Sequence, residues 1–285
     1  MIVSEKIENK EIAKQYKELL RISYQSLSNV DKKLIRSAFD TAVDAHRNQR
    51  RKSGEPYIFH PINVAKIVAQ EIGLDATCIA AALLHDVLED TDYSFKDLEK
   101  LFGSGVAKIV EGLTKISKLS KENQVSLQAE NFRKLLLTLN DDIRVIIIKI
   151  ADRLHNMKTM DAMPEYKQVK IASETLYIYA PLSHRIGLYN IKTELEDLSF
   201  KYTEPENFKF IKNKIEGDKE EQVEYIKSFS KIIKFALAEE KLEYQIKGRS
   251  KSIFSINRKM TIQNIPFENV FDKFAIRIIY KATHR

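Results

Sequence analysis

The stretch LLHDVLEDT, residues 83–91, places one histidine and three carboxylates directly after a run of small apolar residues. On the helix predicted over 76–90, His85 lies four residues before Glu89. Asp86 and Asp90 have the same spacing, so each pair occupies neighbouring strips of the helix surface. Imidazole and carboxylate groups together suit Mn²⁺, Fe²⁺ or Zn²⁺. The stretch therefore indicates part of a metal site, which needs further ligands from elsewhere.

Two further candidate ligands stand on other predicted helices. His60 precedes Pro61 at the start of one helix, and Asp152 follows the apolar run VIIIKIA of another. A buried carboxylate is costly unless it is paired or binds a metal. Taken singly, His60 could be a hydrogen-bonding residue at a helix start, and Asp152 could pair with Arg153 or Lys149. Their combination with the histidine–aspartate pair favours a shared site.

Three of the remaining histidines carry weaker signals. His46 precedes a basic loop, His155 follows Asp152 by three residues on one helix face, and His184 lies in APLSHRIGL. Each could be a hydrogen-bonded structural histidine, and we interpret all three in this way. His46 and His155 could alternatively contact a metal or a substrate.

The charge of the chain favours anionic partners without proving one. The net charge is +7 and the pI is about 9.1, which suits nucleotides or nucleic acid. The 47 basic and 40 acidic residues are nevertheless interspersed, which is typical of a solvated helical surface. The loop QRRKSGEPYIFHP, residues 49–61, contains three adjacent cations, and on charge alone it is an ordinary basic loop.

Sequence signals for other compartments are missing. The single cysteine, Cys78, excludes an intrachain disulfide and lies in an apolar helix, where we expect a buried small side chain. The N-terminus lacks a basic-then-apolar signal, and no apolar stretch approaches ~18 residues. We therefore expect a cytoplasmic protein without a membrane association.

The periodicity predicts a mainly α-helical chain. Gly (8) and Pro (6) are scarce, and helices are expected over 4–24, 31–50, 61–72, 76–90, 92–103, 105–118, 124–139, 141–160, 164–180, 187–203 and 205–240. After about residue 240 the segments LEYQIKGRSKSIFSINRKM and FAIRIIY are strand-like. One strand and part of another cannot bury a sheet face, so we expect a truncated second domain or an engineered fragment.

These motifs resemble a known family. The order His60, His85–Asp86, Asp152 is similar to the pattern of HD-type metal-dependent phosphohydrolases. The segments RRKSGEPYIFHP, AALLHDVLEDT, KIADRLHNMKT and APLSHRIGLYNIKTELEDLSFKY resemble the hydrolase domain of RelA/SpoT-type (p)ppGpp enzymes, and KGRSKSIFSINRKM and FENVFDKFAIRII resemble the opening of their synthetase domain. The resemblance covers roughly residues 30–285. It implies an all-helical HD hydrolase domain over 1–203, a charged helical linker over 204–240 and the incomplete start of an α/β synthetase domain over 241–285.

The resemblance also implies a reaction and a set of roles. The reaction is hydrolysis of the 3′-pyrophosphate of guanosine tetra- or pentaphosphate to GDP or GTP and pyrophosphate. Mn²⁺ would be bound by His60, His85, Asp86 and Asp152. Glu89 and Asp90 would orient or deprotonate the attacking water. Substrate contacts would come from Arg51, Lys52, Ser53, Asn156 and Thr159. Because the histidine–aspartate pair and both following acids are present, we expect an active hydrolase, and the resemblance allows a full-length protein to associate with ribosomes.

The last 45 residues carry a second, partial pattern. The positions that resemble the synthetase site are Arg249, Lys251, Ser255, Lys259 and Asp272. The remaining strands and a later catalytic glutamate would lie beyond Arg285, so we expect no (p)ppGpp synthesis from this chain. Two alternatives to the hydrolase remain: another HD-type phosphohydrolase acting on dNTPs or a different nucleotide, and a non-catalytic nucleotide sensor or RNA-associated protein.

Overall fold

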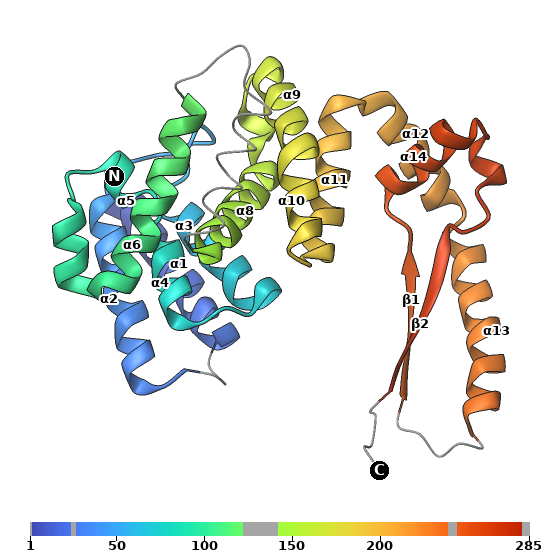
Figure 1. The fold of residues 1–285 in the computed structure, drawn as a ribbon, viewed down its shortest axis with the longest axis horizontal. Coiled ribbons are helices and arrows are strands. Elements are labelled where there is room, and N and C mark those ends of the chain that lie inside the picture. Colours follow the sequence, from blue (N-terminus) through green and yellow to red (C-terminus); the bar gives the residue numbers. More distant parts are fainter. Residues whose placement is uncertain (1, 24–26, 122–141, 239–243, 281–285) are drawn as a thin grey trace. The chain divides into compact units, whose positions relative to one another are not determined.

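The computed structural model describes residues 2–23, 27–121, 142–238 and 244–280 (Figure 1). These residues form two compact units, Met1–Leu195 and Glu196–Arg285, which are described separately. The chain is mainly α-helical, as the sequence predicts. The helix predicted over 124–139 lies outside the described residues.

The first unit consists of helices joined by short connections. In chain order these are α1 (Ile2–Ser23), α2 (Asn29–Ala45), α3 (Phe59–Lys66), the π-helix η1 (Ile67–Ile72), α4 (Ala76–Leu83), α5 (Val87–Asp90), α6 (Phe95–Lys121), α8 (Ile143–Lys158), the 3₁₀ helix η2 (Met160–Ala162), α9 (Glu165–Glu174), the π-helix η3 (Thr175–Tyr179), α10 (Ala180–Arg185) and the first part of α11 (Tyr189–Thr203). Most of their ends lie within a few residues of the predicted ends.

Helix α4 is the centre of the first unit. It packs against α2, α3, α6 and α8, and every residue of α4 except Thr77 is buried. Its sequence ATCIAAAL has small side chains that allow neighbouring helices to approach closely. Cys78 is a buried free thiol, as predicted. Because α4 is fixed on all sides, the residues that follow its C-terminal end are held firmly in place.

The predicted continuous helix over 76–90 is wrong. Helix α4 ends at Leu83, Leu84 leaves helical geometry with φ −103° and ψ 4°, and a turn precedes α5 at Val87. His85 and Asp86 therefore lie in the turn rather than on a helix. The i,i+4 spacing inferred for His85 and Glu89 does not apply, because the two residues belong to different elements.

Local sequence signals explain several boundaries. The start of α2 is capped by Ser28, whose side chain accepts from the Asp31 backbone N–H while the Asp31 carboxylate accepts from Ser28. Gly103, predicted to end a helix, does interrupt the helical geometry within the span of α6, with φ 82° and ψ 164°. A Cβ atom on Gly112 would lie 2.9 Å from a methyl of Val145, so glycine permits the close packing of α6 on α8.

The second unit combines three helices with a two-stranded sheet. The end of α11 is followed by α12 (Pro205–Gly217), α13 (Lys219–Ala238), β1 (Tyr244–Ser250), α14 (Ile253–Gln263), the 3₁₀ helix η4 (Phe267–Asn269) and β2 (Phe274–Tyr280). The strands are antiparallel, with Tyr244 opposite Tyr280 and Ser250 opposite Phe274. The core of this unit contains Phe200, Ile211, Ile256, Phe267 and Val270. Helix α12 packs on α14, and α13 contacts β2.

The strand-like pattern expected through residue 260 stops at Ser250. Ser252 caps α14, since its side chain accepts from the backbone N–H of Ser255. The carboxylate of Asp197 accepts a second N–H at this helix start, that of Phe254, at 2.8 Å. These two caps select helix over strand for the segment that follows.

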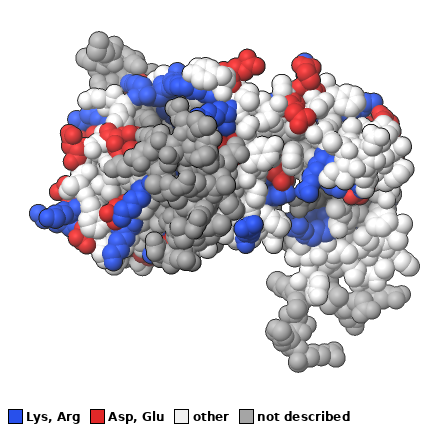
Figure 2. All heavy atoms as spheres, turned by 45° about the horizontal axis from the view of Figure 1, so that its top comes forward, with Lys and Arg blue, Asp and Glu red and all other residues white. Residues whose placement is uncertain are grey.

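Two surface properties bear on function. On the face shown in Figure 2, Lys and Arg side chains lie among Asp and Glu side chains, as their spacing in the sequence predicts. Within the described ranges, no helix combines the length and the apolar character needed to cross a membrane.

Candidate metal centre

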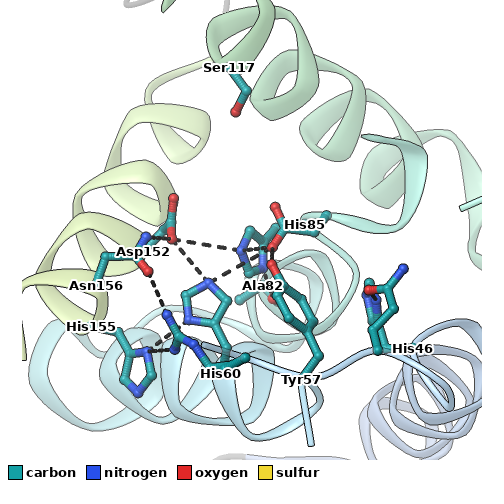
Figure 3. A network of polar contacts seen from close by, with 12 residues as sticks. His46, Tyr57, His60, Ala82, His85, Ser117, Asp152, His155 and Asn156 are labelled. Atoms are coloured by element: carbon teal, nitrogen blue, oxygen red, sulfur yellow. Dashed lines mark hydrogen bonds and ion pairs between the residues drawn. The ribbon is translucent and has the colours of Figure 1, made fainter. Parts of the chain in front are cut away.

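Four potential ligands converge inside the first unit from three places in the chain. His60 comes from α3, His85 and Asp86 from the turn after α4, and Asp152 from α8. Figure 3 labels His60, His85 and Asp152. One ligand atom from each of His60, His85 and Asp152 lies within 4.8 Å of the others. The Oδ2 atom of Asp86 is 2.9 Å from Nε2 of His85 and 3.8 Å from Nε2 of His60. The structure therefore brings together all four ligands predicted from the sequence.

The orientation of His85 fits a bound cation. Its Nδ1 is 2.8 Å from the carbonyl oxygen of Ala82, so Nδ1 carries a proton and donates it. Its Nε2 is fully buried and has no hydrogen-bond partner among the described residues. Although Asp86 lies 2.9 Å away, it is off the direction that a hydrogen bond requires. A buried Nε2 beside two carboxylates is satisfied by a divalent metal ion, whose ligands are of this kind.

Asp152 is fixed by partners on its own helix. Its Oδ2 accepts from Nζ of Lys149 at 2.8 Å, and its Oδ1 accepts from Nδ2 of Asn156 at 2.7 Å. Lys149 also donates to Oγ of Ser117 on α6 at 3.1 Å. Oδ1 of Asp152 is 3.1 Å from Nε2 of His60. The ion pair with Lys149 considered from the sequence is thus present, and the other carboxylate oxygen still faces the candidate ligands.

The ion pair with Arg153, the other partner considered for Asp152, is not formed. The Arg153 guanidinium pairs with Glu174 at 3.1 Å and lies over the ring of Tyr179, with its carbon 4.2 Å from the ring centroid. Side chains at successive helix positions diverge by about 100°, so Arg153 faces α9 and η3 when Asp152 faces the cluster.

The titration of the cluster reflects strong mutual interactions. Burial lowers the pKa of His85, but the carboxylates of Asp86 and Asp152 outweigh it and raise that pKa to about 9. Burial acts to raise the pKa of each aspartate, yet His85 lowers the pKa of Asp86, and Lys149 that of Asp152, below the ordinary value. Both carboxylates are therefore ionised at neutral pH. A cation would replace the proton that they otherwise favour on His85.

The basic loop reaches the cluster through one of its cations. The guanidinium of Arg51 donates from Nη2 to Oδ1 of Asn156 at 3.0 Å, and its Nη1 is 3.3 Å from Nδ1 of His155. Lys52 and Ser53 are exposed beside it. Arg50 instead forms two contacts with Glu8 on α1, at 2.8 and 2.9 Å. Among these neighbours, Arg51 is joined to the cluster and Arg50 to α1.

The end of α8 contributes the last predicted substrate residue. Thr159 follows α8 directly, and its hydroxyl donates to the carbonyl oxygen of His155 at 2.9 Å. Asn156 lies one turn earlier on the same helix and is half-buried. The predicted Arg51, Asn156 and Thr159 therefore surround the C-terminal end of α8, close to Asp152.

Glu89 and Asp90 lie on the short helix α5, directly after the turn that holds Asp86. Glu89 is half-buried and Asp90 is exposed. The backbone carbonyl of Asp90 accepts from Nε2 of Gln49 at 3.0 Å, and Oε1 of Gln49 is 2.7 Å from Nδ1 of His46. This chain of contacts fixes the end of α5 against the first residue of the basic loop.

Three residues at the centre were not singled out as functional from the sequence. Tyr57 donates its hydroxyl to Oδ2 of Asp86, and burial together with that carboxylate raises the pKa of Tyr57. His155 is buried, with its Nδ1 2.7 Å from Nδ1 of His60. His46 is buried beside the ring of Tyr57, with ring centroids 4.9 Å apart. For Tyr57, the signal available in the sequence was its position three residues before His60.

The partial pattern in the second unit forms an ion-pair cluster. The carboxylate of Asp272 is 2.6 Å from Nζ of Lys251 and 2.5 Å from Nζ of Lys259, and these hydrogen bonds lower the pKa of Asp272 to about 2. Ser255 lies in the first turn of α14, where its Oγ is 2.8 Å from that of Ser252. Arg249 lies on β1 opposite Ala275.

The chain is similar to several known proteins. A family model described as HD domain matches residues 38–189. The chain is 47% identical over 253 residues to the probable guanosine-3′,5′-bis(diphosphate) 3′-pyrophosphohydrolase of Synechocystis sp.. It is 46% identical over 252 residues to the GTP pyrophosphokinase of Myxococcus xanthus, and 44% identical over 247 residues to the bifunctional (p)ppGpp synthase/hydrolase SpoT of Escherichia coli.

These alignments cover most of this chain but only part of each relative. Each alignment covers 87% of this chain but only 33%, 33% and 35% of the respective relative, so the chain spans about a third of their length. A solved structure of a metazoan ortholog of SpoT, described as hydrolysing ppGpp, is 32% identical with a TM-score of 0.48. That match covers 61% of this chain and 96% of the solved one.

Proposed function

The chain belongs to the HD domain family and, within it, to the RelA/SpoT-type proteins, and from this membership we propose that it hydrolyses guanosine tetra- or pentaphosphate at the 3′-pyrophosphate. The products are GDP or GTP and pyrophosphate. The observation that carries the proposal is the buried cluster of His60, His85, Asp86 and Asp152, in which a histidine nitrogen faces two ionised carboxylates without a hydrogen-bond partner. The names of the relatives include both hydrolases and a pyrophosphokinase, so this cluster is what favours hydrolysis.

The four clustered residues are proposed to hold one Mn²⁺ ion. Two imidazoles and two carboxylates match the ligands that this metal accepts. When bound, Mn²⁺ stabilises the negative charge that develops on the phosphoryl oxygens. Lys149 and Asn156 hold Asp152, and Tyr57 holds Asp86, so the ligands are oriented before any metal arrives.

The acids of α5 are proposed to handle the attacking water. Glu89 and Asp90 follow Asp86 within four residues and lie near the ligands without belonging to them. One of them accepts a proton as the water oxygen bonds to the phosphorus next to the ribose 3′ oxygen. The bond between that phosphorus and the 3′ oxygen then breaks, and the 3′ oxygen takes up a proton. The oxygen of the water thus ends in pyrophosphate, and a proton ends on the 3′ hydroxyl of the nucleotide.

The basic loop and the end of α8 are proposed to bind the nucleotide. Arg51 presents a planar guanidinium that can stack on guanine, and exposed Lys52 can contact a phosphate as a compact charge. Ser53, Asn156 and Thr159 supply hydrogen-bonding groups around them. The substrate carries several negative charges, which this group of cations complements.

A substrate panel tests the proposal against its alternatives. Metal-stripped protein is supplied with Mn²⁺ and offered ppGpp, pppGpp, GTP or dGTP, and the products are separated by ion-exchange chromatography. We expect pyrophosphate and GDP from ppGpp, pyrophosphate and GTP from pppGpp, and no turnover with excess chelator. Preferential hydrolysis of dGTP would favour another HD-type phosphohydrolase, and binding of ppGpp without turnover would favour a sensor.

Variants of the cluster locate the activity. His85→Ala and Asp86→Ala should abolish pyrophosphate release while the circular dichroism spectrum remains helical. His184→Ala, at an exposed histidine of α10, is the matched control and should retain the activity. Full activity in folded His85→Ala protein would refute the site.

The wider organisation is proposed on the same basis. We propose that residues 1–203 form the hydrolase region, that 204–240 connect it to a synthetase-like region beginning at 241, and that the protein acts in the cytoplasm. Ribosome association of a longer protein is proposed from the family resemblance. Co-sedimentation of full-length protein with ribosomes tests that last proposal.

A further inference from the structure

Resting on the proposed function, we infer that His155 is a positioning residue: it orients the ring of His60 and ties it to Arg51 of the basic loop. The sequence favoured a purely structural role for this histidine. In the structure its contacts are made with one candidate metal ligand and one candidate substrate residue.

The direction of the hydrogen bonds follows from the donors present. Nδ1 of His155 lies 2.7 Å from Nδ1 of His60 and 3.3 Å from Nη1 of Arg51. A guanidinium is always cationic, so Arg51 disfavours a proton on Nδ1 of His155, and the single lone pair left on that nitrogen faces the nearer Nδ1 of His60. The proton between the two imidazoles therefore belongs to Nδ1 of His60. This leaves Nε2 of His60 as the nitrogen that can bind a metal.

His85 reaches the same arrangement by a different route. Its Nδ1 donates to the carbonyl oxygen of Ala82, which also leaves Nε2 available toward the carboxylates. A backbone carbonyl does this for His85, and a side chain does it for His60. Replacing one residue can therefore release the tautomer of His60 while leaving that of His85 intact.

The contacts of His155 belong to a closed ring of five side chains, of which Figure 3 labels His60, Asp152, His155 and Asn156. Arg51 donates to Asn156 at 3.0 Å, and Asn156 donates to Asp152 at 2.7 Å. Asp152 is 3.1 Å from His60, which contacts His155, and His155 returns the ring to Arg51. Two candidate metal ligands thus share one network with a residue of the basic loop. A movement of Arg51 would therefore change the hydrogen bonds of His60 and Asp152 even when no substrate is bound.

The ring is held by elements that are themselves well packed. Helix α8 carries Asp152, His155 and Asn156 within five residues, and its segment from Val145 to Met157 is mostly buried. Helix α3 carries His60 and packs directly on α8. Arg51 is the member that lies in a loop. His155 is held by α8 and contacts both His60 on α3 and Arg51 in the loop. It therefore limits the orientations of the His60 ring and of the Arg51 guanidinium.

Metal binding and ring tautomers test the inference without substrate. In His155→Leu the acceptor is lost, and we expect Mn²⁺ affinity measured by titration calorimetry to fall ~10–100-fold, the usual effect of removing a partner of a ligand. Long-range ¹H–¹⁵N correlation spectra of the metal-free wild type should show the proton of His60 on Nδ1. In the variant they should show His60 exchanging between the Nδ1-protonated and the Nε2-protonated tautomer. His155→Gln, which restores an oxygen acceptor, should recover part of the affinity.

A second variant keeps the test decisive if His155→Leu does not fold. Arg51→Ala removes the charge that disfavours a proton on Nδ1 of His155, so it should weaken Mn²⁺ binding in the absence of nucleotide and allow His60 to exchange between its two tautomers. Arg50→Ala, whose guanidinium pairs with Glu8, is its control. His184→Leu is the control for His155 and should bind Mn²⁺ as the wild type does.

The outcomes separate this inference from the proposed function. Wild-type affinity and an unchanged His60 tautomer in folded His155→Leu, or in Arg51→Ala if the former does not fold, overturn the positioning role even if ppGpp is hydrolysed. The expected changes in binding and tautomer support it even in a protein that fails to hydrolyse ppGpp, because neither measurement involves the substrate.

Discussion

Replacing Lys149 by methionine should destabilise the metal-free protein far more than the metal-bound protein. Lys149 is the cation that faces Asp152, and their side chains are only 14% and 7% exposed. Methionine keeps the length of the side chain and removes the charge. The carboxylate of Asp152 would then remain buried with fewer partners, which is the costly outcome of breaking a buried ion pair.

The size of the effect follows from the contacts that remain. Breaking a buried pair by removing one partner typically costs ~3–5 kcal/mol. Nδ2 of Asn156 still donates to Asp152 at 2.7 Å, so we expect the lower end of this range, ~3 kcal/mol. For a unit of this size, ~2–4 °C is lost per kcal/mol, which predicts a fall in Tm of ~6–12 °C.

Chemical denaturation with and without Mn²⁺ measures the difference. A divalent cation bound at the cluster compensates the negative charge of Asp152 in place of Lys149. Saturating Mn²⁺ should therefore remove more than half of the loss in stability caused by Lys149→Met. Lys115→Met is the matched control, because Lys115 forms an exposed pair with Glu111 at 3.0 Å that is worth less than ~1 kcal/mol. An equal loss of stability with and without Mn²⁺ would refute the inference that Asp152 faces a cation site.

Three other predictions concern protons, the acids of α5 and the basic loop. The pKa of His85 is raised from 6.5 to about 9, so its contribution to the stability of the metal-free protein is complete below pH 6.5 and is lost as the pH rises through 9. Mn²⁺ must displace this proton, so its affinity should increase between these pH values with proton release seen by calorimetry in two buffers; a pH-independent affinity would contradict the geometry. Glu89→Gln and Asp90→Asn should be measured separately, and the variant that loses the base should show kcat lowered ~10²–10⁴-fold with Mn²⁺ affinity retained. Arg51→Ala should raise KM for ppGpp about tenfold or more, as expected for a lost charged hydrogen bond, whereas Arg50→Ala should leave KM unchanged; equal effects of the two would show that loop charge alone matters.

The sequence was sufficient for the helical class and for the set of converging residues. His60, the His85–Asp86 pair and Asp152 could be selected because each ionisable group stands at the edge of a strongly apolar helix, where burial without a partner is unfavourable. The central position of α4 follows from its composition of small apolar residues. Such signals are local, so they can be recognised in a short stretch of sequence without knowing which elements pack against it.

Other features depend on contacts that no local pattern encodes. The break after Leu83 was missed because its residues favour helix; in the structure α4 packs against α2, α3, α6 and α8, and α5 packs against α6. The contacts of Tyr57 with Asp86 and of His155 with His60 join residues 29 and 95 positions apart. The helix α14 was missed for a related reason, because part of its capping comes from Asp197 on α11. In each case tertiary contacts outweighed local preference.

The most direct test is to add Mn²⁺ to metal-stripped protein in the presence of ppGpp and to quantify both products. Equimolar GDP and pyrophosphate, formed with the wild type and absent with folded Asp86→Ala, is the predicted result. Release of inorganic phosphate instead of pyrophosphate, or equal product formation by wild type and Asp86→Ala, would contradict hydrolysis of the 3′-pyrophosphate at this cluster.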